Sequence, residues 1–351
     1  MPEPLPIDVD RMLDFLIGLL NTPSPTGYTQ RALEYVAQAL EPLPLTLRWT
    51  KKGALVAEWP GRADDAPRAL TAHVDTLGAM VKVVKDNGRL RLTKLGGFHW
   101  NTVEGEGCTV FTASGGAIRG TLQVTKASSH VHSSETGDMK RDDAGMEVRL
   151  DERTASALET QALGIQVGDF VAFDPRVERG PAGYLRSRHL DDKASVAAVY
   201  GAVLALVAAG EQPAQRTTLH FSNYEEVGHG AATGFPPDLA ELISVDMAAI
   251  GDTQTSTEHD VTICVKDSGG PYDFNLRLRL EALARQAGIP YKLDIYPFYG
   301  SDGEAYWRAG GDVRVALVGP GVEASHSYER THVEAVQRTA QLLAEYLRQA
   351  G

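Results

Sequence analysis

The stretch TTLHFSNYEEVGHG, residues 217–230, fixes how the rest of this chain is interpreted. An apolar run typical of a strand ends on two adjacent carboxylates, Glu225 and Glu226, and a single acid, Asp246, follows within SVDMA. Adjacent carboxylates at the end of a buried strand repel each other, and a bound cation offsets that cost. A solvated loop tip is the alternative. The pair favours a divalent metal held by one glutamate, with the other moving the proton of a bound water.

The composition is that of an ordinary globular protein. The chain has 351 residues, 43% of them hydrophobic and 23% charged, which predicts two domains or one domain with an insertion. A net charge of −12 argues against nucleic acid as a partner, because phosphate binding requires a basic surface. The two cysteines, Cys108 and Cys264, form no paired motif and are expected to be reduced. No signal peptide is apparent, and the most apolar stretch, residues 194–210, is too short to span a bilayer. We therefore expect a cytoplasmic protein with no membrane contact.

Strands and helices alternate over most of the chain. The hydrophobic pattern predicts helices at 8–20, 28–41, 192–209, 275–288, 303–310 and 332–349, and strand-like runs at 45–59, 68–84, 217–224, 242–248, 262–267, 291–298 and 313–319. This rhythm predicts an α/β fold with a mixed, mostly parallel sheet covered by helices on both faces. Ligands bind such sheets at the strand ends, which is where the acids lie.

The central segment has a different texture. Residues 77–182 contain short alternating runs joined by turns such as Asp86-Asn87-Gly88 and Ser114-Gly115-Gly116, and one candidate short helix at 154–163. We predict a small inserted β-barrel-like domain at 77–182, and a metal-binding domain formed by residues 1–76 and 183–351.

Further candidate ligands lie in the α/β part of the chain. His73 and Asp75 are two apart on a predicted strand and so share a face, as a metal-bound histidine and its orienting carboxylate do. Asp191 and Asp192 begin a predicted helix; one aspartate suffices as a cap, so the other is free to bind a ligand. Asp246 is flanked by apolar residues, where an unpartnered acid is costly.

The last candidate is His326, in a glycine-rich loop where His332 competes with it. Two histidines, three carboxylates, a spare glutamate and an orienting aspartate suit two divalent ions, roughly 3.5 Å apart, sharing one bridging carboxylate. The remaining histidines lack a matching acidic context or lie in the insertion, and we interpret them as structural or surface residues: His99, His130, His132, His189, His220, His229 and His259.

The order of these motifs resembles the M42 family of metallo-aminopeptidases, within the co-catalytic dizinc exopeptidases. The resemblance spans essentially the whole chain, and it includes the insertion between AHVD and LDDK, the EEVG segment and the stretch from SGGPYDF to FYGSD. It implies removal of N-terminal residues from short peptides with two divalent ions per subunit, zinc or cobalt, with manganese an alternative. It also implies dimers that build into dodecamers, with the inserted domain at subunit contacts or controlling substrate access.

The resemblance also implies a role for each site residue. Asp191 would bridge the two metals, with a cis peptide to Asp192. Glu225 would be the general base and Asp75 would orient His73. The remaining ligands would be Glu226 and His326 on one metal, and His73 and Asp246 on the other.

Three departures from the family pattern point to a divergent branch. Thr76 follows Asp75 where the family usually has glutamate, EEVG continues as HGAATG, and the final histidine lies in SHSYERTH instead of His-Ser-Pro-x-Glu. A related dizinc carboxypeptidase, dipeptidase or deacylase is therefore an alternative. A non-catalytic metal-binding assembly protein is a further one, which Glu225 argues against. Residue preference is expected to depend on the insertion and on loops such as Gly300-Ser301-Asp302-Gly303.

Overall fold

The computed structural model describes residues 4–350, which form two compact units. One unit combines the residues up to Asp75 with those from Arg176 onward, and the other is Thr76–Pro175. The second unit ends before residue 182, where the sequence analysis ends the insertion. The reason is pairing: β10 (Glu178–Arg179) and β11 (Tyr184–Ser187) form a small antiparallel sheet with β18 (Glu329–His332) of the first unit.

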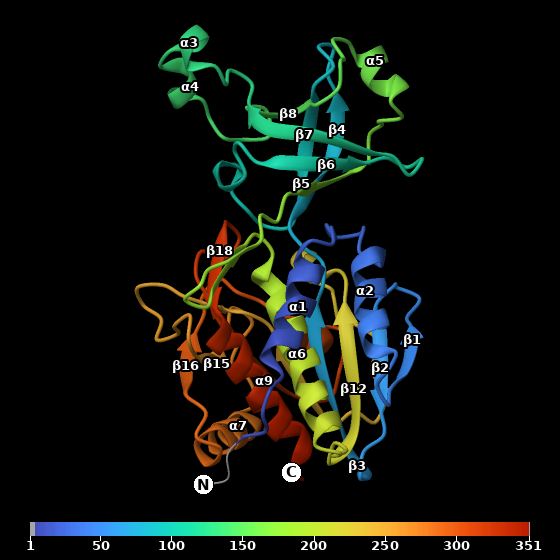
Figure 1. The fold of residues 1–351 in the computed structure, drawn as a ribbon, viewed down its shortest axis with the longest axis vertical. Helices are drawn as coiled ribbons and strands as arrows, with labels where there is room; N and C mark the ends of the chain where they lie inside the picture. Colours follow the sequence, from blue (N-terminus) through green and yellow to red (C-terminus); the bar gives the residue numbers. More distant parts are fainter. Residues whose placement is uncertain (1–3, 351) are drawn as a thin grey trace. The chain divides into compact units, whose positions relative to one another are not determined.

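The first unit is built on a nine-stranded mixed sheet (Figure 1). Its strand order is β1-β2-β12-β3-β13-β17-β15-β16, with β14 paired to β17. Parallel pairs join β12, β3, β13 and β17 at the centre, whereas β1–β2, β2–β12 and β15–β17 are antiparallel. The predicted mixed, mostly parallel sheet is therefore confirmed. The strands are β1 (Thr46–Trp49), β2 (Leu55–Trp59), β3 (Ala63–His73), β12 (Gln215–Ser222), β13 (Glu241–Val245), β14 (Ala248–Ala249), β15 (Val261–Lys266), β16 (Tyr291–Ile295) and β17 (Arg314–Val322).

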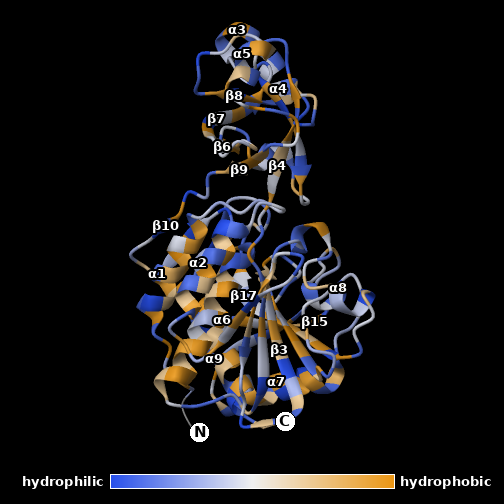
Figure 2. Cartoon of the chain, turned by 90° about the vertical axis from the view of Figure 1, so that its right-hand side faces the viewer, coloured by the Kyte–Doolittle hydropathy of each residue, from blue (hydrophilic) through white to orange (hydrophobic). Residues whose placement is uncertain are grey.

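Helices cover both faces of this sheet. Figure 2 shows α6 (Leu190–Ala208) and α9 (Val333–Arg348) on one side of the strands and α8 (Asp302–Arg308) on the other. The alanine-rich helix α6 is buried around its whole circumference, because it lies between the sheet, α9 and α1 (Val9–Leu20). The other helices of this unit are α2 (Gln30–Leu40) and α7 (Phe274–Gln286), with a 3₁₀ turn, η2 (Glu225–Val227).

The second unit is a closed six-stranded antiparallel barrel, as the sequence predicts. Its order is β4-β5-β8-β7-β6-β9, and its interior is filled by apolar side chains such as Val110, Leu122 and Val148. The elements are β4 (Gly78–Val84), β5 (Leu90–Leu95), η1 (Trp100–Thr102), β6 (Gly107–Phe111), β7 (Ala117–Val124), α3 (Ser129–His132), α4 (Glu135–Asp138), β8 (Met146–Leu150), α5 (Ala157–Ala162) and β9 (Phe170–Phe173). Within residues 4–350, no helix is long and apolar enough to cross a membrane.

Two predicted strands are each divided in the structure. The run 45–59 is the hairpin β1–β2, and the run 68–84 is β3 and β4, which belong to different units. Residues 217–224 form a strand only as far as Ser222, because the chain then turns into η2. The short helices α3 and α4 carry no helical periodicity and were not predicted.

Candidate metal centre

His73 ends the central strand β3 and is the most buried imidazole of the site, with 1% exposure. Its Nε2 atom lies 3.2 Å from Asp191 Oδ1, 3.7 Å from Glu225 Oε2 and 4.0 Å from Asp246 Oδ2. Its Nδ1 atom is 2.9 Å from the main-chain carbonyl oxygen of Asp75. Donation from Nδ1 to this carbonyl leaves Nε2 facing the three carboxylates.

Asp191 lies between two histidines. Its Oδ1 atom faces His73, and its Oδ2 atom lies 3.3 Å from His326 Nε2, which is also 3.7 Å from Glu226 Oε2. Two groups with ligand atoms within 4.8 Å of one another share this aspartate: His73, Asp191 and Asp246, and Asp191, Glu226 and His326. The peptide bond from Asp191 to Asp192 is cis, as the resemblance implies.

The carboxylates of this cluster are buried close together, where their negative charges repel one another. Burial raises the pKa of Glu225 and Asp246 well above the ordinary range and that of Glu226 to about 8, and repulsion from neighbouring acids adds to each shift. Burial acts in the same direction on Asp191, but hydrogen bonds with His326 and His73 lower its pKa below the ordinary range. A cluster of this kind is stabilised by cations.

The donor set fits divalent metal ions. Each group offers one imidazole nitrogen and two carboxylates, which are ligands that zinc, cobalt and manganese accept. Within residues 4–350, the buried atoms Glu226 Oε1 and Asp246 Oδ1 have no hydrogen-bond partner. Such oxygens are costly unless they coordinate a cation.

Asp75 holds the glutamate pair as well as lying beside His73. Its Oδ1 atom accepts the main-chain amide of Glu225 at 3.1 Å, and its Oδ2 atom accepts the amide of Glu226 at 3.3 Å and the hydroxyl of Thr26 at 2.8 Å. The distance from Oδ1 to His73 Nδ1 is 3.5 Å. The sequence suggested only the contact with His73.

Two further acids support the cluster and were not foreseen in these roles. Glu329 is fully buried, and it accepts the amide of Asp191 at 3.0 Å and the amide of His326 at 3.1 Å. His326 has a positive φ of 63°, which this hydrogen bond helps to hold. Asp192 Oδ2 accepts the amide of His73 at 3.2 Å. The only feature of the sequence that could have indicated Glu329 is its position three residues after His326.

The structure places His326 in the cluster and His332 elsewhere. His332 caps α9, where its Nδ1 atom accepts the amide of Glu334 at 3.2 Å, and its Nε2 atom is 2.8 Å from the carbonyl oxygen of Ala182. His259, His332 and Glu334 form another group close enough to hold a cation, but both ring nitrogens of His332 are already engaged. Among the described residues, none of the seven other histidines belongs to the two groups around Asp191.

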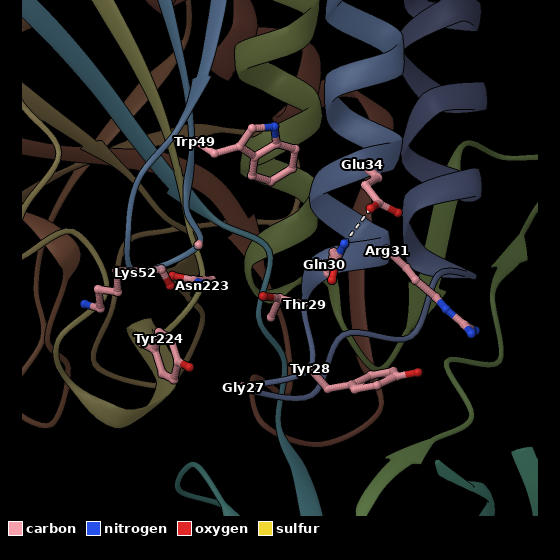
Figure 3. Close-up of a pocket in the computed structure, with 11 residues that line it drawn as sticks. Gly27, Tyr28, Thr29, Gln30, Arg31, Glu34, Trp49, Lys52, Asn223 and Tyr224 are labelled. Atoms are coloured by element: carbon pink, nitrogen blue, oxygen red, sulfur yellow. Dashed lines mark hydrogen bonds between the residues drawn. The ribbon is translucent and has the colours of Figure 1, made fainter. Parts of the chain in front are cut away.

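A cavity of about 890 Å³ lies in the same unit. Asn223 and Tyr224, the residues just before Glu225, line one side, and Thr29, Gln30 and neighbouring residues of α2 line the other (Figure 3). The cavity thus adjoins the segment that carries the glutamate pair.

Comparisons with known proteins agree with this architecture. The profile of the family described as M42 glutamyl aminopeptidase matches residues 53–342. The protein named "Putative aminopeptidase YhfE" from Bacillus subtilis (strain 168) is 44% identical over 339 residues, 97% of this chain and 98% of that relative.

Solved structures share the fold. The TET aminopeptidase of the marine sediment archaeon Thaumarchaeota archaeon SCGC AB-539-E09 has a TM-score of 0.87 at 17% identity, with 97% of each chain covered. The TET1 peptidase of Pyrococcus horikoshii has a TM-score of 0.83 at 20% identity, with 97% of this chain and 100% of that chain covered.

The family match and the 44% identical relative, together with the clustered acids and histidines, define a peptidase of the metal-dependent class. This chain belongs to the M42 glutamyl aminopeptidase family, and it is a hydrolase of the aminopeptidase type.

Proposed function

We propose that this protein removes N-terminal residues from short peptides with two divalent ions bound at the cluster. His73 and Asp246 would hold one ion, Glu226 and His326 the other, and Asp191 would bridge them. The observation that carries this assignment is the position of Asp191, whose two carboxylate oxygens face different histidines at 3.2 and 3.3 Å. Zinc or cobalt is the expected metal, and manganese suits the same nitrogen and oxygen ligands.

Bound divalent ions polarise a carbonyl and lower the pKa of a water. Glu225 would take the proton of that water and deliver it to the leaving amine. Its position favours this role: its side chain is 16% exposed, and its Oε2 atom lies 3.7 Å from His73 Nε2. Asp75, bonded to the Glu225 amide and next to His73, would orient both groups.

The cavity beside Tyr224 supports a peptide as substrate. Its volume of about 890 Å³ lies within the range of sites that enclose a ligand larger than one side chain. We propose that a short peptide occupies it in part.

The protein is also proposed to act as a cytoplasmic homo-oligomer, with the barrel unit at subunit contacts or controlling substrate access. Of two TET1 peptidase structures with a similar fold, one is a dodecamer, and the other is of a peptidase that can assemble into a tetrahedron or a large octahedral shell. Light scattering of the purified protein tests the assembly.

A substrate panel separates the proposed function from related ones. The enzyme, stripped with a chelator and reloaded with zinc, cobalt or manganese, is expected to release amine from aminoacyl-p-nitroanilides and free amino acids from tripeptides. Acetylation of the N-terminus should abolish both reactions. Hydrolysis of the acetylated substrates would favour a carboxypeptidase or deacylase, activity restricted to dipeptides would favour a dipeptidase, and inactivity with every metal would favour a non-catalytic protein.

A further inference from the structure

In the loop that follows the glutamate pair, two charged side chains form hydrogen bonds to the same peptide group. Lys52 Nζ donates to the carbonyl oxygen of Gly230 at 2.9 Å, and Asp302 Oδ1 accepts the amide of Ala231 at 2.7 Å. The Gly230 carbonyl and the Ala231 amide belong to the same peptide unit. An ammonium and a carboxylate therefore act on opposite ends of one dipole, and each strengthens the hydrogen bond of the other.

Lys52 connects the beginning and the end of this loop. It lies in the turn between β1 and β2, and Figure 3 shows it beside Asn223 and Tyr224. Its carbonyl oxygen accepts the side-chain amide of Asn223 at 3.0 Å, and its Nζ atom also donates to the carbonyl of His229. The ammonium lies 5.5 Å from the ring centroid of Tyr224.

Asp302 makes the matching connection from the other side. It is the first residue of α8, is 2% exposed, and its Oδ2 atom accepts the hydroxyl of Ser222, the last residue of β12. Three residues earlier, the hydroxyl of Tyr299 donates to the carbonyl of Met247 at 2.9 Å, next to Asp246. The segment 299–302 therefore ties together the two strand ends that carry acids of the cluster.

Gly230 is required for the close approach of Asp302 to this loop. A Cβ atom added there would lie 2.1 Å from Asp302 Oδ1 and 2.8 Å from the Ser222 hydroxyl oxygen. Only a residue without a side chain allows Asp302 to approach the loop this closely. Lys52, Gly230 and Asp302, which are far apart in the sequence, therefore meet at one peptide group.

We propose that Lys52 and Asp302 are positioning residues that act as one clamp on the segment 223–231 and thereby fix the Glu225 carboxylate relative to His73. Neither residue belongs to the groups that hold the metals, and neither is assigned a step in the reaction. The proposal deepens the proposed function and rests on the role given there to Glu225.

A double-mutant cycle tests the clamp. The variants are Lys52→Met, Asp302→Ala and their combination, assayed with an aminoacyl-p-nitroanilide at equal metal content. Each single variant is expected to lose about 10–100-fold in kcat with KM changed less than about 3-fold, because a shift of about 1 Å in a catalytic group has effects of this size. The kcat of the combined variant should be no more than about 3-fold below that of the less active single variant, because the effects of two residues that act as one unit do not add.

Two kinds of control accompany the cycle. Asp302→Asn keeps an oxygen that accepts the Ala231 amide, and it should restore kcat to within about 5-fold of wild type. Arg216→Met and Asp238→Ala break an exposed ion pair at the opposite end of β12, and they should leave kcat unchanged. Multiplied losses in the combined variant, or failure of Asp302→Asn to restore turnover, would overturn the clamp.

Hydrogen exchange gives a readout that needs no turnover. In the metal-loaded protein without substrate, Lys52→Met and Asp302→Ala should speed amide exchange about 10-fold or more in the peptide covering 223–231, because each lowers the free energy of local opening. Arg216→Met should not. Unchanged exchange in both clamp variants would refute the proposal. If wild-type protein hydrolyses no substrate, the proposed function fails while exchange still decides the clamp.

Discussion

Asp75 joins the histidine and the glutamate pair of the candidate metal centre. Its carboxylate accepts the amide of Glu225 at 3.1 Å, while its main-chain carbonyl oxygen lies 2.9 Å from His73 Nδ1. One residue thus orients a proposed ligand through its backbone and the proposed base through its side chain.

Asp75→Asn is therefore expected to reduce kcat/KM by about 10–100-fold, the range found when partners of metal-binding residues are replaced. Asparagine cannot accept both glutamate amides, because one of its two terminal atoms is an NH₂ group. Thr26→Val removes only the third hydrogen bond to this carboxylate and should cost less than about 10-fold. Steady-state assays of both variants decide this, and wild-type kinetics for Asp75→Asn would contradict it.

The general-base assignment predicts a separation of metal binding from turnover at the glutamate pair. Glu225→Gln preserves size but cannot take a proton, so kcat should fall by about 10²–10⁴-fold with metal content retained. Glu226→Gln should instead lose metal, since Glu226 belongs to the group with Asp191 and His326. Elemental analysis and kinetics on the same preparations make the comparison. Near-wild-type hydrolysis by Glu225→Gln would exclude it as the base.

Asp246 provides a test of metal number. If two ions share Asp191, Asp246→Ala should lower the metal content from roughly two toward one per subunit, because only one group contains Asp246. Asp252→Ala, an exposed aspartate a few residues further on, is the matched control and should retain full content. Full occupancy in Asp246→Ala, measured by elemental analysis after dialysis, would remove it from the ligand set.

The two late histidines should behave differently when truncated. His326→Ala is expected to lose metal and activity together, because its Nε2 atom faces Asp191 and Glu226. His332→Ala should keep both and lose about 2 kcal/mol of stability, because it removes both the helix cap and the hydrogen bond to the Ala182 carbonyl. Denaturant unfolding and metal analysis measure the two effects. The reverse pattern would assign the final ligand to His332.

Much of this architecture could be predicted from local signals. The alternation of strands and helices predicts the sheet, and Glu225 and Asp246 stand out because acids rarely end apolar runs. The insertion was predicted to begin at residue 77, inside the run 68–84, but the break between β3 and β4 was not predicted, because apolar residues continue on both sides of it.

The supporting residues were not predictable in the same way. Glu329 contacts Asp191 from 138 positions away, and Asp302 contacts Ser222 from 80 positions away. Glu329 is the first residue of the short strand β18 and Asp302 is the first residue of α8, where acids are common. Their roles depend on tertiary contacts that one sequence does not display.

A second pair of acids, away from the metal centre, predicts a pH dependence of stability. Glu304 is 4% exposed, and burial together with a hydrogen bond to Asp267 raises its pKa to about 7. Arg308 donates to Glu304 at 2.7 Å, and the hydroxyl of Tyr272 donates to Asp267. A proton on Glu304 would reduce the repulsion between the two carboxyl groups.

The sign follows from proton binding. Between the unfolded pKa of about 4.3 and the folded value of about 7, the folded protein binds more protons, so stability falls as pH rises through this window. Glu304→Gln removes the titrating proton, so its melting temperature should gain on wild type between pH 5 and pH 7.5, by about 2–4 °C for each kcal/mol. Exposed Glu323→Gln is the control, with a difference from wild type that stays constant. Calorimetry at several pH values across this range measures the melting temperatures. If the difference in melting temperature between Glu304→Gln and wild type is also constant, the Asp267–Glu304 pair does not share a proton.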